Sequence, residues 1–373
     1  MDLLRTLVFL SILIFVHEVG HFLLAKRVGI KVEEFGFGLP PRLFGKKIGD
    51  TIYSLNLLPI GGFVRLFGED SAELTPARRG VGGKEPADAF YAQSKRVRVA
   101  VVIAGVVMNF LFGILVFGSI FSFLGIPEAT DRVQIVGIAP GSPAEANFRL
   151  GDEIVSVVGE RISTTDEFKQ LVDTRKGQEV QFVVLRDLKR LDIRAVPRPN
   201  PPADEGSLGV IISPIVAFVH YPIWQMPFRG VWYGMQEAFY WGVNIIEGLG
   251  GVLRDLFRGI VPKEVGGPFE IHFLFREASK VGWVPQLQLL AILSVNLGII
   301  NLFPFPPLDG GRVLFIGIEA VTGRKIRARV EQVIHTVGMV ILLALMLAIT
   351  VQDILRRFGA GSLVALFQRV VRM

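Results

Sequence analysis

The chain has 373 residues, of which 51% are hydrophobic and 20% charged, and its formal net charge is +6. This composition indicates a membrane protein, and the positive charge fits basic loops beside anionic lipid. Nucleic acid is not an expected partner, because the chain has no array of basic and aromatic residues. The chain contains no cysteine, which excludes disulfides, thiolate metal sites and cysteine nucleophiles.

Four segments have the length and apolar composition of membrane-spanning helices, which need roughly 20 residues to cross a bilayer. We expect spans at Leu3–Leu24, Val99–Leu124, Pro285–Phe303 and Val333–Val351. The first is expected to be a retained helix rather than a cleaved signal peptide, because Asp2 weakens the positively charged start that such peptides have.

The first span contains "FVHEVGHFLL", which puts His17, Glu18 and His21 inside an apolar run. Histidines four residues apart lie on one helical face, and the H-E-x-x-H pattern is typical of zinc sites in which the glutamate accepts a proton from water. With 5 histidines in the chain, roughly 0.003 accidental matches are expected. The alternative is that these polar side chains line a transporter cavity or pack between helices.

Residues 25–98 form a glycine-rich loop that contains "DTIYSLNLLPIGGFVRLFGED". Two segments with strand propensity flank the turn residues Pro59–Gly62, which predicts a hairpin. A plain cytoplasmic turn is the alternative interpretation of these residues.

The polar insertion at 128–200 is large enough to form a soluble domain. Its sequence "VQIVGIAPGSPAEANFRLGDEIVSVVGERI" predicts a strand, a turn, a short helix and a second strand, followed by a helix at Thr165–Thr174 and a strand at Glu179–Leu185. The elements "PGSPA" and "LGDEIVSVVG" resemble a circularly permuted bacterial PDZ domain. Such domains bind an extended segment at a sheet edge, which the resemblance puts near Ile135 and Gly137.

The region at 201–283 combines a proline-rich linker with an apolar stretch at 230–257. That stretch carries charged side chains along its length, at positions 237, 247, 254 and 255. Charges spread in this way are expensive in hydrocarbon but ordinary for a helix at the membrane surface, so we expect an interfacial helix.

The third span runs into "NLFPFPPLDGG", where Asp309 is the candidate for a third metal ligand. Three prolines break the helix there, and the two glycines allow close backbone approach. With four spans, His17, His21 and Asp309 come at the exits of the first and third spans, which open on the same side of the membrane. A turn that merely leaves the third span is the alternative for this segment.

Basic residues indicate which side this is. They gather after the first span, before the second and between the third and fourth, at positions 26, 27, 31, 95–98 and 324–329. The positive-inside rule makes these loops cytoplasmic and puts the insertion at 128–200 on the opposite side. Arg356, Arg357, Arg369 and Arg372 at the C-terminus argue the other way, unless the segment "LVALFQRVV" lies flat on the membrane surface.

The sequence thus predicts an α-helical polytopic membrane protein, with about four transmembrane helices and an inserted α+β PDZ-like domain. We divide it into 1–127 with two spans, the insertion at 128–200, the linker and surface helix at 201–283, and 284–373 with the last two spans.

Together these segments resemble the site-2 protease family of intramembrane zinc metalloproteases. The resemblance covers nearly the whole chain, including "HEVGHFLLAKRVGIKVEEFGFG", "AFYAQSKRVRVAVVIAG", "GGPFEI" and "SVNLGIINLFPFPPLDGGRVL". It implies Zn²⁺ as the cofactor, held by His17, His21 and Asp309, with Glu18 as the catalytic base. It further implies that substrate is held by side chains and backbone at Asn301, Pro304, Pro306, Tyr53, Leu55, Gly61 and Gly62.

The same resemblance implies a location in the inner (cytoplasmic) membrane, with an active site towards the cytoplasm. The substrates would be single-pass membrane proteins, such as anti-sigma factors or signal-peptide remnants, cut in or near their transmembrane segment. The loop hairpin would enter the bilayer and pair with the unwound substrate. A metal transporter and a membrane-anchored PDZ scaffold are the rival functions, and neither explains why Glu18 accompanies the histidines.

Overall fold

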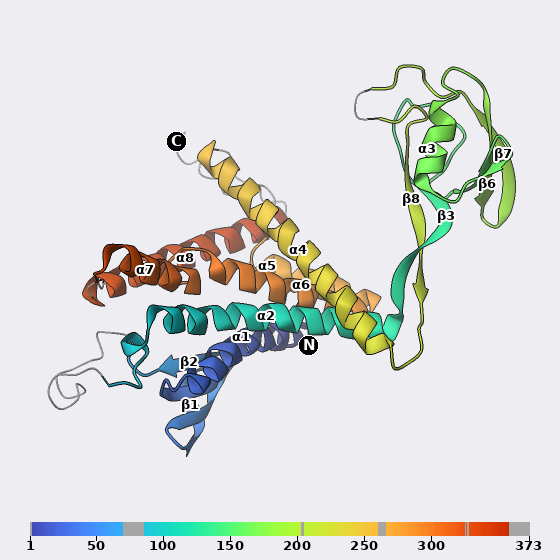
Figure 1. The fold of residues 1–373 in the computed structure, drawn as a ribbon. Coiled ribbons are helices and arrows are strands. Elements are labelled where there is room, and N and C mark those ends of the chain that lie inside the picture. Colours follow the sequence, from blue (N-terminus) through green and yellow to red (C-terminus); the bar gives the residue numbers. More distant parts are fainter. Residues whose placement is uncertain are drawn as a thin grey trace. The chain divides into compact units, whose positions relative to one another are not determined.

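The computed structural model describes residues 2–69, 86–202, 205–259, 266–324, 326 and 328–357 (Figure 1). Its elements form two compact units. One unit draws on Met1–Ile120 and Pro227–Met373, and the other on Phe121–Met226. Of the four C-terminal arginines that complicate the orientation, Arg356 and Arg357 end helix α8, whereas Arg369 and Arg372 lie outside the described residues.

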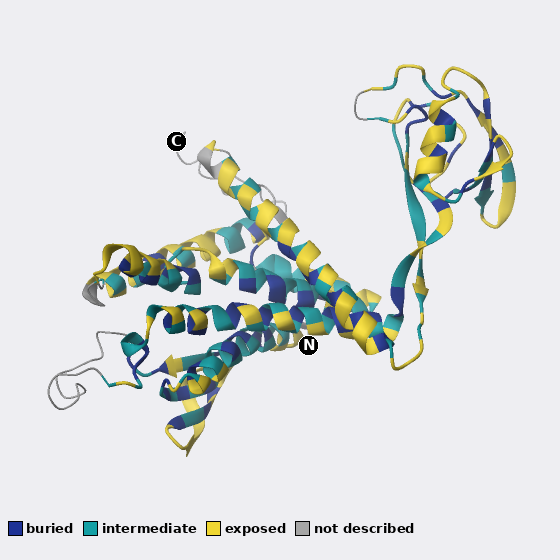
Figure 2. Ribbon diagram, in the orientation of Figure 1, coloured by how far each residue is buried: buried dark blue, intermediate teal, exposed yellow. Residues whose placement is uncertain are grey.

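Four helices of the described chain are long and apolar enough to cross a membrane, and they coincide with the four predicted spans. They are α1 (Asp2–Arg27), α2 (Lys95–Leu124), α6 (Trp283–Leu302) and α8 (Ala328–Arg357). The most apolar stretch of α2 is 33% buried and that of α8 only 6%, so α2 lies centrally whereas α8 is largely uncovered (Figure 2).

Small residues let α1 and α2 approach each other closely. A Cβ atom added to Gly20 would lie 2.3 Å from the carbonyl oxygen of Ala104, so no larger residue fits there. Close backbone approach through small residues is a common way for membrane helices to associate. This contact brings the face of α1 that carries His17 and His21 against α2.

Two shorter helices and one long helix complete this unit: α5 (Pro268–Val281), α7 (Asp309–Thr322) and α4 (Met226–Phe257). Helix α4 packs on α2, because a Cβ atom at Gly234 would lie 2.4 Å from the backbone nitrogen of Gly118. α4 is not among the four candidate spans, and its position at the membrane surface stays a prediction.

The loop after α1 differs from the predicted hairpin. Strand β1 (Val32–Ile48) precedes β2 (Thr51–Leu66), and both halves of β2 pair with β1 rather than with each other. Phe35, for example, lies opposite Val64 on one side and Tyr53 on the other. The turn therefore falls after Ile48 instead of at Pro59–Gly62.

Glycines explain why β1 was not predicted. Gly36 and Gly38 weaken the strand signal of this segment, since glycine has low strand propensity. In the sheet they are required: a Cβ atom at Gly36 would lie 2.5 Å from the Phe63 ring, and one at Gly38 would lie 2.5 Å from the Leu58 carbonyl oxygen. A short 3-10 helix, Phe90–Ala92, then leads into α2.

The second unit is a sheet with one helix. The strand order is β7-β6-β4-β3-β8, and β5 pairs with β4. Helix α3 (Thr165–Asp173) begins with a capping box in which Thr164 and Glu167 bond each other's backbone N–H groups. The strands are β3 (Ile126–Ile138), β4 (Glu153–Val157), β5 (Glu160–Arg161), β6 (Val180–Arg186), β7 (Lys189–Ala195) and β8 (Val210–Val219).

Strand β8 changes two expectations for this unit. It joins the sheet after residue 200, so the unit extends past the boundary expected from the sequence, up to Met226. It also pairs with β3 along Ile135 and Gly137, while β4 pairs with β3 on the other side. The edge at Ile135–Ile138 that we predicted to be open is therefore covered, because the strand that covers it follows the proline-rich segment that looked like a linker.

Candidate functional site

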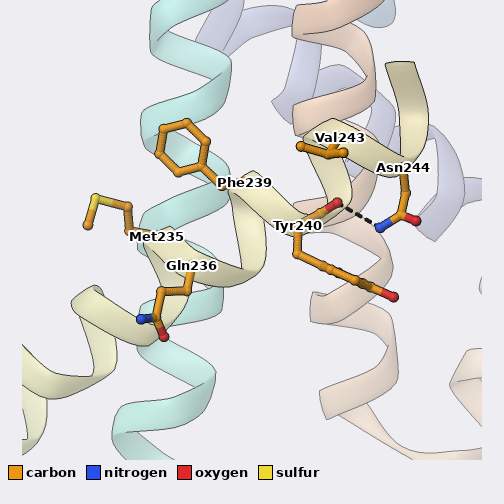
Figure 3. A pocket seen from close by; sticks show the side chains of 6 residues that line it. All are labelled: Met235, Gln236, Phe239, Tyr240, Val243 and Asn244. Atoms are coloured by element: carbon orange, nitrogen blue, oxygen red, sulfur yellow. Dashed lines mark hydrogen bonds between the residues drawn. The ribbon is translucent and has the colours of Figure 1, made fainter. Parts of the chain in front are cut away.

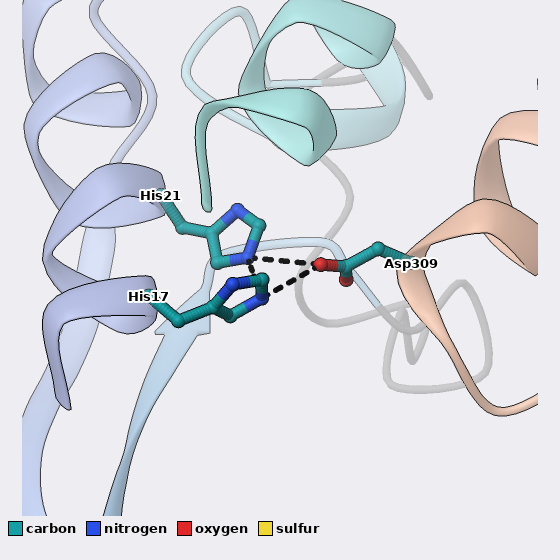
Figure 4. Close-up of side chains that lie close together, drawn as sticks. All are labelled: His17, His21 and Asp309. Carbon is teal, nitrogen blue, oxygen red and sulfur yellow. Dashed lines mark hydrogen bonds and ion pairs between the residues drawn. The ribbon is translucent and has the colours of Figure 1, made fainter. Parts of the chain in front are cut away.

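Three side chains from α1 and α7 converge in the first unit, which contains the four long apolar helices (Figure 4). His17 and His21 lie one turn apart on α1, with their Nε2 atoms 3.1 Å from each other. Asp309, the first residue of α7, places its Oδ2 atom 2.8 Å from His17 Nε2 and 3.3 Å from His21 Nε2. The structure thus brings together the three predicted ligands, although 292 positions separate Asp309 from His17.

These distances fit a zinc ion. Tetrahedral coordination at about 2.0–2.1 Å sets neighbouring donor atoms about 3.3 Å apart. Two imidazole nitrogens and a carboxylate oxygen within 2.8–3.3 Å of one another are close to that arrangement. Three protein ligands also leave a fourth position open, as catalytic zinc sites require.

Glycines hold Asp309 in place. Helix α6 ends at Leu302, and the connection folds so tightly that a Cβ atom at Gly310 would lie 2.2 Å from the Phe303 carbonyl oxygen. A Cβ atom at Gly311 would lie 2.9 Å from the Phe305 carbonyl oxygen. Both glycines therefore allow the close backbone approach expected from the sequence.

The two histidines favour the ionised form of Asp309. Burial alone would raise the pKa of its carboxyl group, but the His17 and His21 rings, when protonated on Nε2, outweigh burial and lower the pKa below its usual range. A carboxylate that ligates a metal must be deprotonated, so this environment favours the ligating form. Its side chain is 18% exposed.

Glu18 lies beside His17 on α1 and contacts the hairpin that β1 and β2 form. Its Oε2 atom accepts a hydrogen bond from the backbone N–H of Val64, at 2.9 Å. Val64 belongs to the end of β2 that, within the described chain, pairs with β1 on one side only. The outer edge of this sheet therefore runs next to the glutamate.

Sequence reasoning overlooked what α2 contributes to this site. The carbonyl oxygen of Val101 lies 2.8 Å from His21 Nδ1, and Nδ2 of Asn109 lies 3.2 Å from His17 Nδ1. A buried amide in an otherwise apolar span was the available signal for Asn109. The contact of Val101 is made by its backbone, which leaves no trace in the sequence.

The predicted substrate residues lie in different parts of the fold, and Asn301 contacts one of the three candidate ligands. Asn301 Nδ2 is 3.3 Å from His17 Nε2, whereas Pro304 and Pro306 lie in the connection between α6 and α7. Tyr53 and Leu55 have β1 residues paired on both sides, so their backbone offers no free edge.

Gly61 and Gly62 lie instead at the end of β2 that faces α1. A Cβ atom at Gly61 would lie 3.1 Å from the Ile14 side chain, and one at Gly62 would lie 3.3 Å from the Phe15 ring. The N–H of Gly61 donates to Ser11 Oγ at 3.2 Å, which fixes the strand on the helix.

A concave surface lies on α4 (Figure 3). Its lining combines apolar side chains with two amides and one phenol, and it contains no histidine or carboxylate that would serve as a metal ligand. The lining residues are Met235, Gln236, Phe239, Tyr240, Val243 and Asn244.

Known proteins resemble the chain over most of its length. The model of peptidase family M50 matches residues 5–345. A protein named as a putative zinc metalloprotease in Brucella suis is 33% identical over 351 residues, covering 90% of this chain and 90% of its own. A similarly named protein of Clostridium perfringens is 33% identical over 358 residues, covering 95% and 99%.

The zinc metalloprotease RasP of Geobacillus kaustophilus is 29% identical over an aligned length of 426, gaps included, and the alignment covers 96% of this chain and 98% of RasP. Among solved structures, the PDZ domain of an SdrC-like protein from Listeria monocytogenes is similar to 23% of this chain and 93% of its own, with 17% identity and a TM-score of 0.21. The family match over most of the chain and the identity to whole relatives show that this protein belongs to peptidase family M50, the site-2 protease family, and is a multi-pass membrane zinc metalloprotease.

Proposed function

We propose that the protein hydrolyses a peptide bond in or near the transmembrane segment of single-pass membrane proteins. The observation that carries the proposal is the convergence of His17, His21 and Asp309 beside Glu18, among helices that are long and apolar enough to cross a membrane. These three side chains would hold the zinc ion. Anti-sigma factors and signal-peptide remnants are the expected classes of substrate.

Zinc, when bound, supplies the Lewis acidity that activates water and polarises the scissile carbonyl. Glu18 accepts a proton from the attacking water and passes it to the nitrogen of the breaking peptide bond, which leaves as an amine. The Val64 N–H holds the Glu18 carboxylate in one orientation for both transfers. Asn301, 3.3 Å from His17 Nε2, is placed to contact the substrate carbonyl.

The hairpin edge would hold the substrate in an extended form. Peptide bonds in a helix are shielded by their own hydrogen bonds, so a transmembrane substrate must unwind before it is cut. Within the described strands, the end of β2 with Gly61 and Gly62 pairs with β1 on one side only, and an added strand there would take the place of the Ser11 contact with the Gly61 N–H. That strand would run alongside α1, where Glu18 lies.

The experiment that tests this function compares purified wild type with Glu18→Gln on a model single-span substrate in detergent. The wild type should retain about one zinc per chain and cleave the substrate. Glu18→Gln should retain zinc but cleave about 10²- to 10⁴-fold more slowly, the usual contribution of a general base. Cleavage by Glu18→Gln at the wild-type rate would rule out this role, and zinc binding without any cleavage would favour the transporter or scaffold.

We also propose that the sheet unit is PDZ-like and binds an extended protein segment at the outer edge of β8. Among the described strands, β8 comes last in the sheet and pairs with β3 alone, and its side chains Ile211 and Phe218 are exposed. Photo-crosslinking residues placed at Ile211 should capture a substrate protein in membranes, and those placed at Arg190 on β7 should not. Equal capture at both positions would exclude β8 as the specific edge.

A further inference from the structure

One face of α2 supports both histidines. Val101, Gly105 and Asn109 follow one another at intervals of four residues, so they lie in line along the helix. A Cβ atom at Gly105 would lie 2.4 Å from His21 Nε2 and 2.7 Å from His17 Cε1. Glycine at this position therefore lets the two rings lie directly on the helix.

The contact of Val101 fixes the proton of His21. A carbonyl oxygen only accepts hydrogen bonds, so His21 Nδ1, 2.8 Å away, must carry the ring proton in this contact. In the neutral ring Nε2 is then unprotonated, and its lone pair points to the other two candidate ligands. Metal-bound histidines commonly donate their second nitrogen to such a partner, which orients the ring.

His17 needs the same arrangement at its own Nδ1 atom. When Nε2 binds a metal, Nδ1 carries the proton of the neutral ring and requires an acceptor. The neighbour of Nδ1 is the amide of fully buried Asn109, whose nitrogen lies 3.2 Å away. The oxygen of this amide, Oδ1, is buried and has no hydrogen-bond partner among the described residues.

Rotation of the amide by half a turn exchanges its oxygen and nitrogen. We propose that Asn109 is a positioning residue for the metal: its Oδ1 accepts the His17 Nδ1 proton and holds the ring with Nε2 towards zinc. This inference rests on the proposed ligand set. Ser294, whose Oγ donates to the Asn109 backbone oxygen at 2.8 Å, fixes the helix next to the amide without touching the ring.

The test measures zinc affinity and zinc dissociation rate of the purified full chain by competition with a chelator. Asn109→Leu removes the hydrogen-bond acceptor but keeps a side chain of similar size. It should weaken zinc binding about 10- to 100-fold, the usual effect of losing the hydrogen-bond partner of a metal ligand. Asn109→Asp keeps an acceptor and should bind zinc as the wild type does. Ser294→Ala is the matched control, because it removes a buried hydrogen bond to the Asn109 backbone and leaves the Asn109 side-chain amide in place.

Equal zinc affinity in Asn109→Leu and Ser294→Ala would overturn the role of Asn109, whether both match the wild type or both are weakened. If Asn109→Leu does not fold, Asn109→Ala repeats the test with a side chain that fits the same space. His17→Ala separates the two proposals: if it binds zinc as tightly as the wild type, the ligand set itself fails. Loss of zinc in His17→Ala with full affinity in Asn109→Leu would refute only the positioning role.

Discussion

The backbone N–H of Val64 donates a hydrogen bond of 2.9 Å to the carboxylate of Glu18, which joins the sheet edge to the candidate catalytic base. The two residues are 46 positions apart and belong to β2 and α1. Because the donor is a backbone group, side-chain substitution alone does not remove it. The geometry of the base is thus tied to the position of the hairpin.

Val64→Pro should lower the cleavage rate while zinc stays bound. Proline lacks the N–H, and at an edge position whose N–H faces away from the paired strand it disturbs the sheet least. A hydrogen bond to a charged group is worth about 1.5–3 kcal/mol, which corresponds to a loss of about 10- to 100-fold. Val64→Ala keeps the N–H and is the control; equal cleavage rates in the two variants would show that Glu18 does not depend on this bond.

Removal of Asp309 should release the metal. Asp309→Ala is expected to weaken zinc binding by more than about 100-fold, because a direct ligand is lost. This exceeds the usual effect of losing a residue that only hydrogen-bonds to a ligand. Zinc content after dialysis against a chelator measures this. Asp353→Asn changes another buried carboxylate, which accepts a hydrogen bond from the Gly267 N–H, and should keep its zinc. Wild-type zinc content in Asp309→Ala would remove Asp309 from the ligand set.

A buried ion pair fixes α7, the helix that begins at Asp309. Arg98 of α2 bonds Glu319 at 2.6 Å, and their side chains are 10% and 11% exposed. Arg98→Leu leaves the Glu319 charge without this partner and should lower the free energy of unfolding by about 3–5 kcal/mol. The double variant Arg98→Leu, Glu319→Leu should recover most of that loss in detergent unfolding experiments. A double variant as unstable as the single one would show that the pair acts through packing instead.

The orientation in the membrane can be tested directly because the chain has no cysteine. We predict that Arg324, between α7 and α8, faces the cytoplasm and that Leu188 of the sheet unit, 92% exposed, faces the other side. In intact cells, a membrane-impermeant maleimide should label Leu188→Cys and spare Arg324→Cys. Both should react after permeabilisation. Labelling of Arg324→Cys alone in intact cells would reverse the orientation.

Local patterns were sufficient for much of this protein. The four spans follow from runs of apolar residues, which depend only on bilayer thickness. His17 and His21 share a face because helical periodicity places residues four apart together. The proximity of Asp309 followed from the number of spans, since exits of the first and third spans open on the same side.

Contacts between distant segments decided the rest. Strand β1 depends on glycines that fit against Phe63 and Leu58, and these contacts cannot be predicted from local strand propensity. The pairing of β8 with β3 could not be predicted either, because β8 follows a segment that resembles a linker. The Val64 N–H reaches Glu18, and Asn109 reaches His17, only because α1 packs between the hairpin and α2. The sequence determined the candidate spans and the candidate ligands, whereas only the tertiary structure placed the groups that contact those ligands, because these contacts join backbone and side chains far apart in the chain.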